Sequence, residues 1–236
     1  MKEKILITGA SGLIGKALVK QLQDANYTVV QLSRKAKHSE GIYKWDYTRG
    51  YLEEKALEGV NHIIHLAGAG IVDKPWTIKR KKELRDSRIE TLGLLLEKVR
   101  ELSIPLKTLV STSGINYYGT STSEYIYTED DAPANDFIGN LCQEWEEQAF
   151  SFTPLCRVVC LRLGIVLAKN GGALPKMALP HRFGLGAPLG SGKQYMPWVS
   201  ALDAVNCMQF AIQETKIAGV FNLVSGEDCT NYTFNK

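Results

Sequence analysis

The sequence of 236 residues contains no long uninterrupted apolar segment. One of its longest apolar runs, 158–167, is interrupted by Arg162 and is shorter than the roughly 20 residues that a membrane-spanning helix needs. The N-terminus, MKEKILITG, has neither the apolar core nor the small-residue cleavage site of a signal peptide. We therefore expect no membrane partner and a cytoplasmic location.

The sequence also has few cysteines and no large excess of charge of either sign. The five cysteines are an odd number and include no Cys-x-x-Cys pair, which predicts reduced thiols, no disulfide and no metal site. The net charge of +3 is too small to predict a nucleic-acid partner. Residues 79–82 form a local basic run, and we favour its interpretation as a solvent-exposed helix face.

Apolar runs and turn signals alternate regularly along the chain. This alternation predicts an α/β fold of the Rossmann type, with a doubly wound parallel sheet, right-handed crossovers and helices on both faces. The run at 157–167 is apolar enough to predict one strand that is buried on both faces. Strands are expected at 4–8, 27–33, 62–67, 106–111, 157–167 and 219–224, and helices at 15–24, 79–102, 135–150 and 200–214.

The turn TGASGLIG, between the first strand and the first helix, predicts a dinucleotide site. Gly9 permits the tight turn, Gly12 lets the backbone approach a pyrophosphate, and Gly15 allows close helix packing. The N-terminus of the helix offers free N–H groups and a positive dipole to the anion. The predicted contacts in this turn come from Gly9, Ser11, Gly12, Leu13, Ile14 and Gly15.

The end of the second strand predicts which dinucleotide binds. NAD-binding proteins place a carboxylate there, whereas this chain has Ser33 and Arg34. A guanidinium and a hydroxyl favour the phosphorylated ribose of NADP(H), although Arg34 could instead only face solvent. Gly68, after the third expected strand, lets the backbone line the cofactor or ends a plain turn. Asp46 either meets the adenine or caps a turn.

The glycine- and proline-rich stretch at 171–198 is typical of loops and short helices. We therefore predict an NADP(H)-binding Rossmann domain at 1–168 and a small substrate-side lobe at 169–236 that interleaves with the core. Because the chain stops in mid-pattern, we expect the lobe to be truncated at its C-terminal end.

Ordered motifs along nearly the whole chain resemble one family. The sequence is similar to the epimerase-family group of atypical extended short-chain dehydrogenases/reductases, which are NAD-dependent epimerase/dehydratase-like and are often labelled nucleoside-diphosphate-sugar epimerases or cell-division inhibitors. The motifs are TGASGLIG, LSRK, WD, HLAG, DSRIET, NYYG, DFIGNLCQEWE, LRLGIVLAKNGGALPKM and GLGAPLGSGKQYMPW.

The resemblance implies further cofactor contacts and a continuation of several tens of residues beyond the present end. From spacing alone, Arg88 could pair with Glu83 or face the cofactor. The implied NADP(H) contacts are Ser33, Arg34, Leu66, Ala67, Glu83, Arg88 and Val166.

The resemblance also implies a catalytic pair that this sequence lacks. Active members of the superfamily use a Ser or Thr with Tyr-x-x-x-Lys, in which Lys lowers the pKa of the Tyr. Here no Tyr has a Lys four residues later, and the expected helix has Phe137 instead. Ser113 is the remaining candidate serine. Tyr117 or Tyr118 could replace the missing acid, or both could simply pack the pocket.

Two functions therefore stay open. The first is an NADP(H)-dependent oxidoreductase or epimerase acting on a small carbonyl or sugar-nucleotide substrate, with Ser113 and a pocket tyrosine in catalytic roles. The second is a non-catalytic NADP(H)-sensing regulatory protein. The resemblance further implies a homodimer paired through the two long helices, 79–102 and 135–150.

Overall fold

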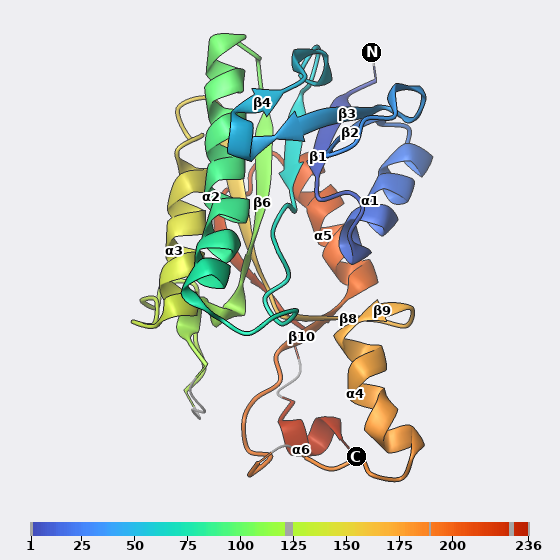
Figure 1. Cartoon of the computed structure of the whole chain (residues 1–236), viewed down its shortest axis with the longest axis vertical. Coiled ribbons are helices and arrows are strands. Elements are labelled where there is room, and N and C mark those ends of the chain that lie inside the picture. Colours follow the sequence, from blue (N-terminus) through green and yellow to red (C-terminus); the bar gives the residue numbers. More distant parts are fainter. Residues whose placement is uncertain (1, 121–124, 189, 227–228, 236) are drawn as a thin grey trace.

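The computed structural model describes residues 2–120, 125–188, 190–226 and 229–235. Within these ranges the core is an eight-stranded sheet in the order β11-β7-β6-β5-β1-β2-β3-β4, and every neighbouring pair is parallel except β3 with β4 (Figure 1). Its strands are β1 (Lys4–Thr8), β2 (Thr28–Ser33), β3 (Ile42–Asp46), β4 (Tyr51–Leu52), β5 (His62–His65), β6 (Thr108–Gly114), β7 (Arg157–Leu163) and β11 (Gly219–Leu223).

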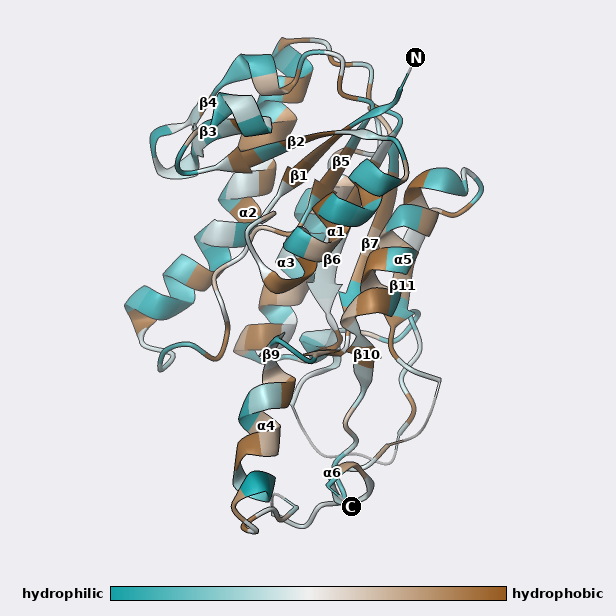
Figure 2. Cartoon of the chain, turned by 90° about the vertical axis from the view of Figure 1, so that its right-hand side faces the viewer, coloured by the Kyte–Doolittle hydropathy of each residue, from teal (hydrophilic) through white to brown (hydrophobic). Residues whose placement is uncertain are grey.

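Helices cover both faces of this sheet, which confirms the predicted Rossmann architecture. α1 (Leu13–Asp24) and α5 (Ala201–Gln213) pack on one face, and α2 (Ile78–Glu101) and α3 (Phe137–Phe150) pack on the other. Successive strand residues alternate between the two cores because strand side chains point to opposite faces. In β1, Leu6 packs with α2 and α3, whereas Ile5 and Ile7 pack with α1. The brown strands and teal outer helix faces of Figure 2 show the same division.

The prediction of one strand over 157–167 is wrong. β7 ends at Leu163, and β8 (Ile165–Ala168) belongs to a second sheet of order β10-β8-β9. Gly164 donates to Leu223 of β11, but Ile165 donates to Pro197, so the hydrogen-bonding partner changes at Gly164. A Cβ at Gly164 would lie 2.8 Å from the Pro197 carbonyl oxygen, which explains a glycine there. Burial on both faces holds inside β7 but not in β8.

Two strands that were not predicted, β3 and β4, extend the sheet beyond β2. They are short, and a tight turn joins them. The carboxylate of Asp46 accepts hydrogen bonds from the backbone N–H of Thr48 at 3.1 Å and from its hydroxyl at 2.6 Å. Asp46 therefore caps a turn, one of its two predicted roles.

A smaller lobe lies beyond the carboxyl ends of the main strands (Figure 1). α5 and β11, although late in the sequence, return to the main sheet, so the lobe interrupts the core along the chain. The division at residue 168 stays a prediction. The lobe contains β8, β9 (Gly171–Gly172), α4 (Ala173–Arg182), β10 (Trp198–Ser200) and α6 (Asn231–Phe234).

Among the described helices, none combines the length and the apolar character needed to cross a membrane.

Candidate cofactor and substrate site

The turn between β1 and α1 has the geometry of an anion site. Gly9 has φ +68°, and a Cβ there would lie 2.6 Å from the Leu66 carbonyl oxygen. A Cβ at Gly15 would lie 2.5 Å from the Gly9 carbonyl oxygen, so both glycines are required by the protein itself. A Cβ at Gly12 would have only the Gly9 carbonyl within 4 Å, at 3.2 Å. The open side of the turn is therefore at Gly12.

The first turn of α1 has donors to offer. Gly12 is the N-cap and makes no side-chain cap, and the first turn contains no acidic residue. A helix N-terminus without a cap presents free N–H groups and a positive dipole. The predicted contacts Leu13 and Ile14 lie in this first turn, and Ser11 immediately precedes the N-cap.

The end of β5 is tied to the turn by one hydroxyl. Thr8 Oγ1 accepts hydrogen bonds from the backbone N–H of Leu66 at 3.2 Å and of Ala67 at 3.1 Å. The predicted contacts at 66–68 and those at 9–15 therefore lie side by side at the carboxyl edge of the sheet.

The end of β2 faces the first half of α2. The pKa of the Tyr47 hydroxyl reflects this arrangement. Burial raises this pKa, and the charges of Asp86 and Glu83 raise it further. The charge of Arg34 lowers it. Arg34 and Glu83, which are distant in sequence, thus act on the same group. Ser33 is the last residue of β2, and its Oγ accepts a weak hydrogen bond from the N–H of Lys35 at 3.4 Å.

Arg88 does not pair with Glu83, which excludes one of its two predicted roles. Glu83 instead pairs with Arg80 at 2.7 Å. The guanidinium of Arg88 is buried beneath the 68–70 loop and donates to the carbonyls of Leu84 and Ala69 at 2.9 and 3.0 Å. Burial lowers the pKa of Arg88 to about 10. It has no carboxylate partner among the described residues.

β8 and β9 bring Val166 to the turn. A Cβ at Gly172 would lie 2.8 Å from Leu13 Cδ2 and 3.5 Å from the Val166 carbonyl oxygen. The β8–β9 ribbon therefore packs on the first residue of α1, and the predicted contact Val166 lies near the phosphate turn although more than 150 residues separate them in sequence.

Ser113 is buried on β6, with 4% of its surface exposed. Its hydroxyl has no oxygen or nitrogen partner in the described part of the chain. Its neighbour is the thiol of Cys142, whose pKa is raised to about 11, mainly by burial. Ser113 thus offers a hydroxyl next to a thiol that stays protonated at neutral pH.

Tyr118 is held by a buried ion pair. Arg162 Nη1 donates to its hydroxyl at 2.7 Å, and Arg162 is itself held by Glu146, with Nε–Oε1 at 2.9 Å and Nη2–Oε2 at 2.8 Å. The hydroxyl of Tyr118 lies 2.8 Å from both the Thr128 carbonyl and Asn222 Oδ1. Since it has one proton, it donates to one of these acceptors.

The pKa of Tyr118 is raised, because burial outweighs the opposing effect of Arg162. The hydroxyl therefore stays protonated and fully hydrogen-bonded. Tyr117 contributes its ring face instead, with the Arg162 guanidinium 3.4 Å from the ring centroid. The sequence around Tyr117 and Tyr118 has no nearby cation, and the fold brings the guanidinium of Arg162 to both side chains.

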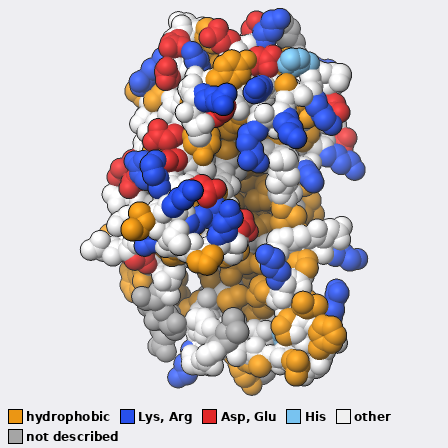
Figure 3. Space-filling model, viewed as in Figure 1, with side chains coloured by type: hydrophobic (Ala, Val, Ile, Leu, Met, Phe, Trp, Pro, Cys, Tyr) orange, Lys and Arg blue, Asp and Glu red, His pale blue; other side chains and the backbone are white. Residues whose placement is uncertain are grey.

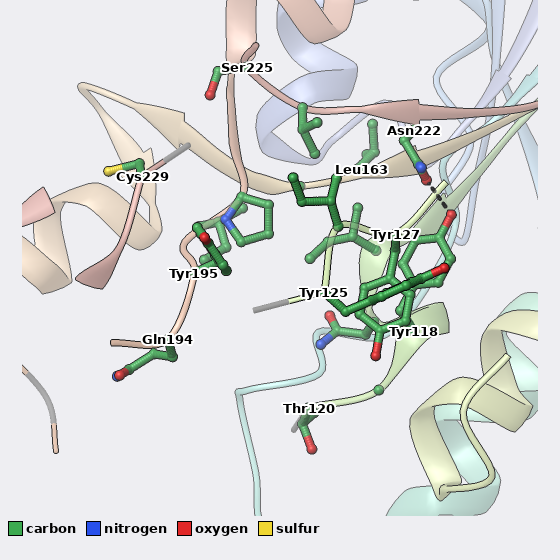
Figure 4. A pocket seen from close by; sticks show the side chains of 18 residues that line it. Tyr118, Thr120, Tyr125, Tyr127, Leu163, Gln194, Tyr195, Asn222, Ser225 and Cys229 are labelled. Carbon is green, nitrogen blue, oxygen red and sulfur yellow. Dashed lines mark hydrogen bonds between the residues drawn. The ribbon is translucent and has the colours of Figure 1, made fainter. Parts of the chain in front are cut away.

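A cavity of about 480 Å³ opens at the carboxyl ends of β6, β7 and β11. Figure 4 shows Tyr118, Tyr125 and Tyr127 together on one side, and Tyr195 and Cys229 on the other. Ser113 and Tyr117 are not part of the wall among the described residues. Of the three predicted catalytic residues, Tyr118 alone lines this cavity.

The helix expected to carry a Tyr-Lys pair has an apolar replacement for each. Phe137 begins α3 and packs against Trp76, with ring centroids 5.4 Å apart. Leu141, four residues later, is buried. Within the described residues, no group of three or more His, Cys, Asp or Glu side chains could hold a metal ion.

Sequence reasoning missed the partners of Arg162. The signal was present, since a lone arginine inside an apolar strand requires a buried acceptor. The register adds that Ser113, Arg162 and Asn222 are paired neighbours across β6, β7 and β11, so they lie in one row on the same face of the sheet.

Comparison with known proteins gives a consistent result. The family model described as "NAD dependent epimerase/dehydratase family" matches residues 5–223. Epimerase family protein Mb2239 of Mycobacterium bovis is 36% identical over 231 residues, covering 98% of this chain and 76% of that protein. Human epimerase family protein SDR39U1 is 34% identical over 236 residues, covering 98% of this chain and 78% of that protein.

Solved structures agree with this fold. Human SDR39U1 (isoform2), solved with NADPH, has a TM-score of 0.86 at 33% identity and covers 98% of this chain and 77% of its own. A nucleoside-diphosphate sugar epimerase from Corynebacterium glutamicum has a TM-score of 0.87 at 28% identity and covers 100% of this chain and 49% of its own. The chain belongs to the NAD dependent epimerase/dehydratase family.

Proposed function

We propose that this chain binds NADP(H) along the carboxyl edge of its main sheet and uses it in the oxidation or reduction of a small carbonyl or alcohol substrate. The observation that carries the proposal is the turn at Gly9–Gly15, with its uncapped helix N-terminus and its open side at Gly12. These residues fit a pyrophosphate because the protein leaves room and donors at that point.

The preference for NADP(H) over NAD(H) rests on the end of β2. Arg34 is exposed there and acts on the same tyrosine as the acidic groups of α2. A guanidinium can bind a 2′-phosphate with two hydrogen bonds, whereas a carboxylate at this position would repel it. A relative at 33% identity, human SDR39U1, was solved with NADPH, which supports the same cofactor here.

The reaction balances as carbonyl plus NADPH plus a proton giving alcohol plus NADP⁺. The bound cofactor would supply the hydride equivalent. The protein would supply the proton and orient the carbonyl, and Ser113, Tyr117 and Tyr118 are the candidates for these tasks. Of the three, Tyr118 alone lines the cavity among the described residues, which favours it for contact with the substrate. The Ser113 hydroxyl is buried, has no nitrogen or oxygen partner in the described structure, and lies outside the described wall.

The second candidate function is a non-catalytic NADP(H) sensor. Phe137 and Leu141 replace the catalytic pair, and the hydroxyl of Tyr118 is already committed to Arg162 and its neighbours. A protein that retains the cofactor turn but has lost the proton donor would report cofactor occupancy without turnover.

Loss of NADPH absorbance against a panel of aldehydes, ketones and quinones separates the two functions. The enzyme hypothesis predicts turnover that falls at least about tenfold in Tyr118→Phe, the candidate that lines the cavity. The control is Tyr27→Phe. Tyr27 packs beside α1, on the face of the sheet opposite to α2 and α3. NADPH binding without turnover on any compound would favour the sensor.

A cytoplasmic location is part of the proposal. All five cysteines are free thiols, and reduced thiols are typical of cytosolic proteins. We also propose that nucleic acid is not a partner, since three of the four residues of the basic run at 79–82 are engaged within the chain. Arg80 pairs with Glu83, Lys81 lies 4.8 Å above the Phe137 ring, and Lys82 pairs with Asp86.

A homodimer paired through α2 and α3 stays a prediction. Apart from Ile78, every exposed position of α2 carries a charged side chain, and Arg85 pairs with Glu144 of α3 at 2.6 Å. A dimer through these helices would therefore have a polar interface. Sedimentation equilibrium would show whether it forms.

A further inference from the structure

We propose that the cavity beside Tyr118 binds a flat, uncharged aromatic ketone, and not a sugar nucleotide. The inference rests on the proposed redox function and specifies its substrate class. Its basis is a wall of tyrosine rings with fixed orientation, together with the lack of charge on the described wall.

Three tyrosines form one side of the cavity as a stacked group (Figure 4). The rings of Tyr118 and Tyr127 are stacked, with centroids 4.8 Å apart and an interplanar angle of 19°. Tyr125 meets Tyr127 edge to face, with centroids 4.9 Å apart. Such contacts between aromatic rings favour a defined mutual orientation.

Polar contacts at their hydroxyls hold two of these rings in place. Tyr118 is fixed by Arg162, as described above, and the Tyr125 hydroxyl donates to Asp131 Oδ1 at 2.9 Å. Asp131 in turn accepts from the N–H of Thr128 at 2.7 Å. The ring faces are thus oriented before a ligand binds, which reduces the entropy lost on binding.

The rings remain accessible. Tyr127 is 38% exposed, Tyr125 is 58% exposed, and Tyr195 on the opposite wall is 39% exposed. Figure 3 shows hydrophobic side chains over the lower part of the molecule, where the smaller lobe that begins with β8 lies. A flat apolar ring placed between the walls would remove this aromatic surface from water.

The described wall contains no Lys, Arg, His, Asp or Glu. Arg162 lies behind Tyr118, and its charge is compensated by Glu146. A diphosphate requires charged partners, so this wall suits a neutral ligand.

Polar groups in the wall can orient a carbonyl. The amides of Asn116 and Asn222 and the hydroxyl of Ser225 line the cavity. The Ser225 hydroxyl is buried and has no hydrogen-bond partner among the described residues. A small number of such polar groups among apolar walls usually fixes the orientation of a bound neutral ligand.

The test is a set of calorimetric titrations of the full chain in the presence of NADP⁺, which cannot reduce the ketone. The ligands are methyl naphthyl ketone, naphthoate and UDP-glucose; the first two share a ring system and a similar shape but differ in charge. The ketone should bind at least about tenfold more tightly than either anion. Tyr127→Leu should weaken the ketone about tenfold, whereas Tyr51→Leu, an exposed tyrosine on β4, should leave it unchanged.

UDP-glucose or naphthoate binding as tightly as the ketone would overturn the inference, as would wild-type ketone affinity in Tyr127→Leu. A separate NADPH titration of each variant distinguishes the two failures. If NADPH binds and the ketone does not, the substrate class is wrong while the cofactor proposal stands. If NADPH itself does not bind, the proposed function fails.

Discussion

Arg162 and Glu146 form a bidentate ion pair inside the protein, with 2% and 6% of their surfaces exposed. They come from β7 and α3. Burial works against the charged guanidinium, yet the hydrogen bonds and the charge of Glu146 hold the pKa of Arg162 above its ordinary value. The pair links the α3 helix to the strand that leads into the cavity and fixes Tyr118 there.

Breaking this pair should destabilise the protein strongly. Arg162→Met leaves a buried carboxylate without its partner, and Glu146→Leu leaves a buried guanidinium, so each should cost about 3–5 kcal/mol. The double variant Arg162→Met/Glu146→Leu should lose clearly less than the sum of the two. Urea unfolding measures all three, and single variants with wild-type midpoints would contradict the ion pair.

Arg34→Glu should remove the preference for NADPH over NADH. The new carboxylate would repel the 2′-phosphate and accept a hydrogen bond from the 2′-hydroxyl instead. Titration with both cofactors checks this outcome, and Arg49→Glu, on the exposed turn after β3, serves as a surface-charge control. An unchanged preference would mean that Arg34 only faces solvent.

Gly12→Val should weaken both dinucleotides at least about tenfold while the protein stays folded, because the side chain would occupy the approach of the pyrophosphate. The matched control is Gly93→Ala on α2, where a new Cβ would lie 3.8 Å from Gln148, an ordinary contact. Circular dichroism verifies folding. Wild-type affinity in a folded Gly12→Val protein would place the site elsewhere.

Stability should fall as the pH drops below 6.5, partly because of His65. This side chain is fully buried, and burial, with the charge of Arg88 as a second cause, lowers its pKa to about 3. Its Nε2 lies 3.0 Å from Thr91 Oγ1, whose proton is directed to helix carbonyls. Nε2 therefore carries the proton of the neutral ring.

The unfolded chain binds a proton at His65 near pH 6.5 while the folded chain does not. Its contribution to stability is therefore present above pH 6.5 and decreases towards pH 3, by about 2 kcal/mol between pH 7 and 5. Urea midpoints at pH 7 and 5 measure the loss, and His65→Gln should reduce it by that amount. An equal loss in both proteins would assign the effect to other groups, His62 included.

Much of the fold follows from local sequence. Residues 4–8 form β1 as predicted, and the long helix predicted at 79–102 is α2 (Ile78–Glu101), because periodicity and turn residues act over short distances. The break at Gly164 could not be predicted, since it depends on Pro197 from a distant segment. Arg162 shows the same limit at the site: the sequence marks it as unusual, but its partners Glu146 and Tyr118 are brought to it by the fold.

The most direct measurement of the central claim is the ratio of the NADPH and NADH dissociation constants of the wild-type chain, obtained by fluorescence titration. The account predicts micromolar or tighter NADPH binding and at least about tenfold weaker NADH binding, since one charge-assisted phosphate contact is worth about 1.5–3 kcal/mol. Equal affinities, or tighter NADH binding, would contradict it.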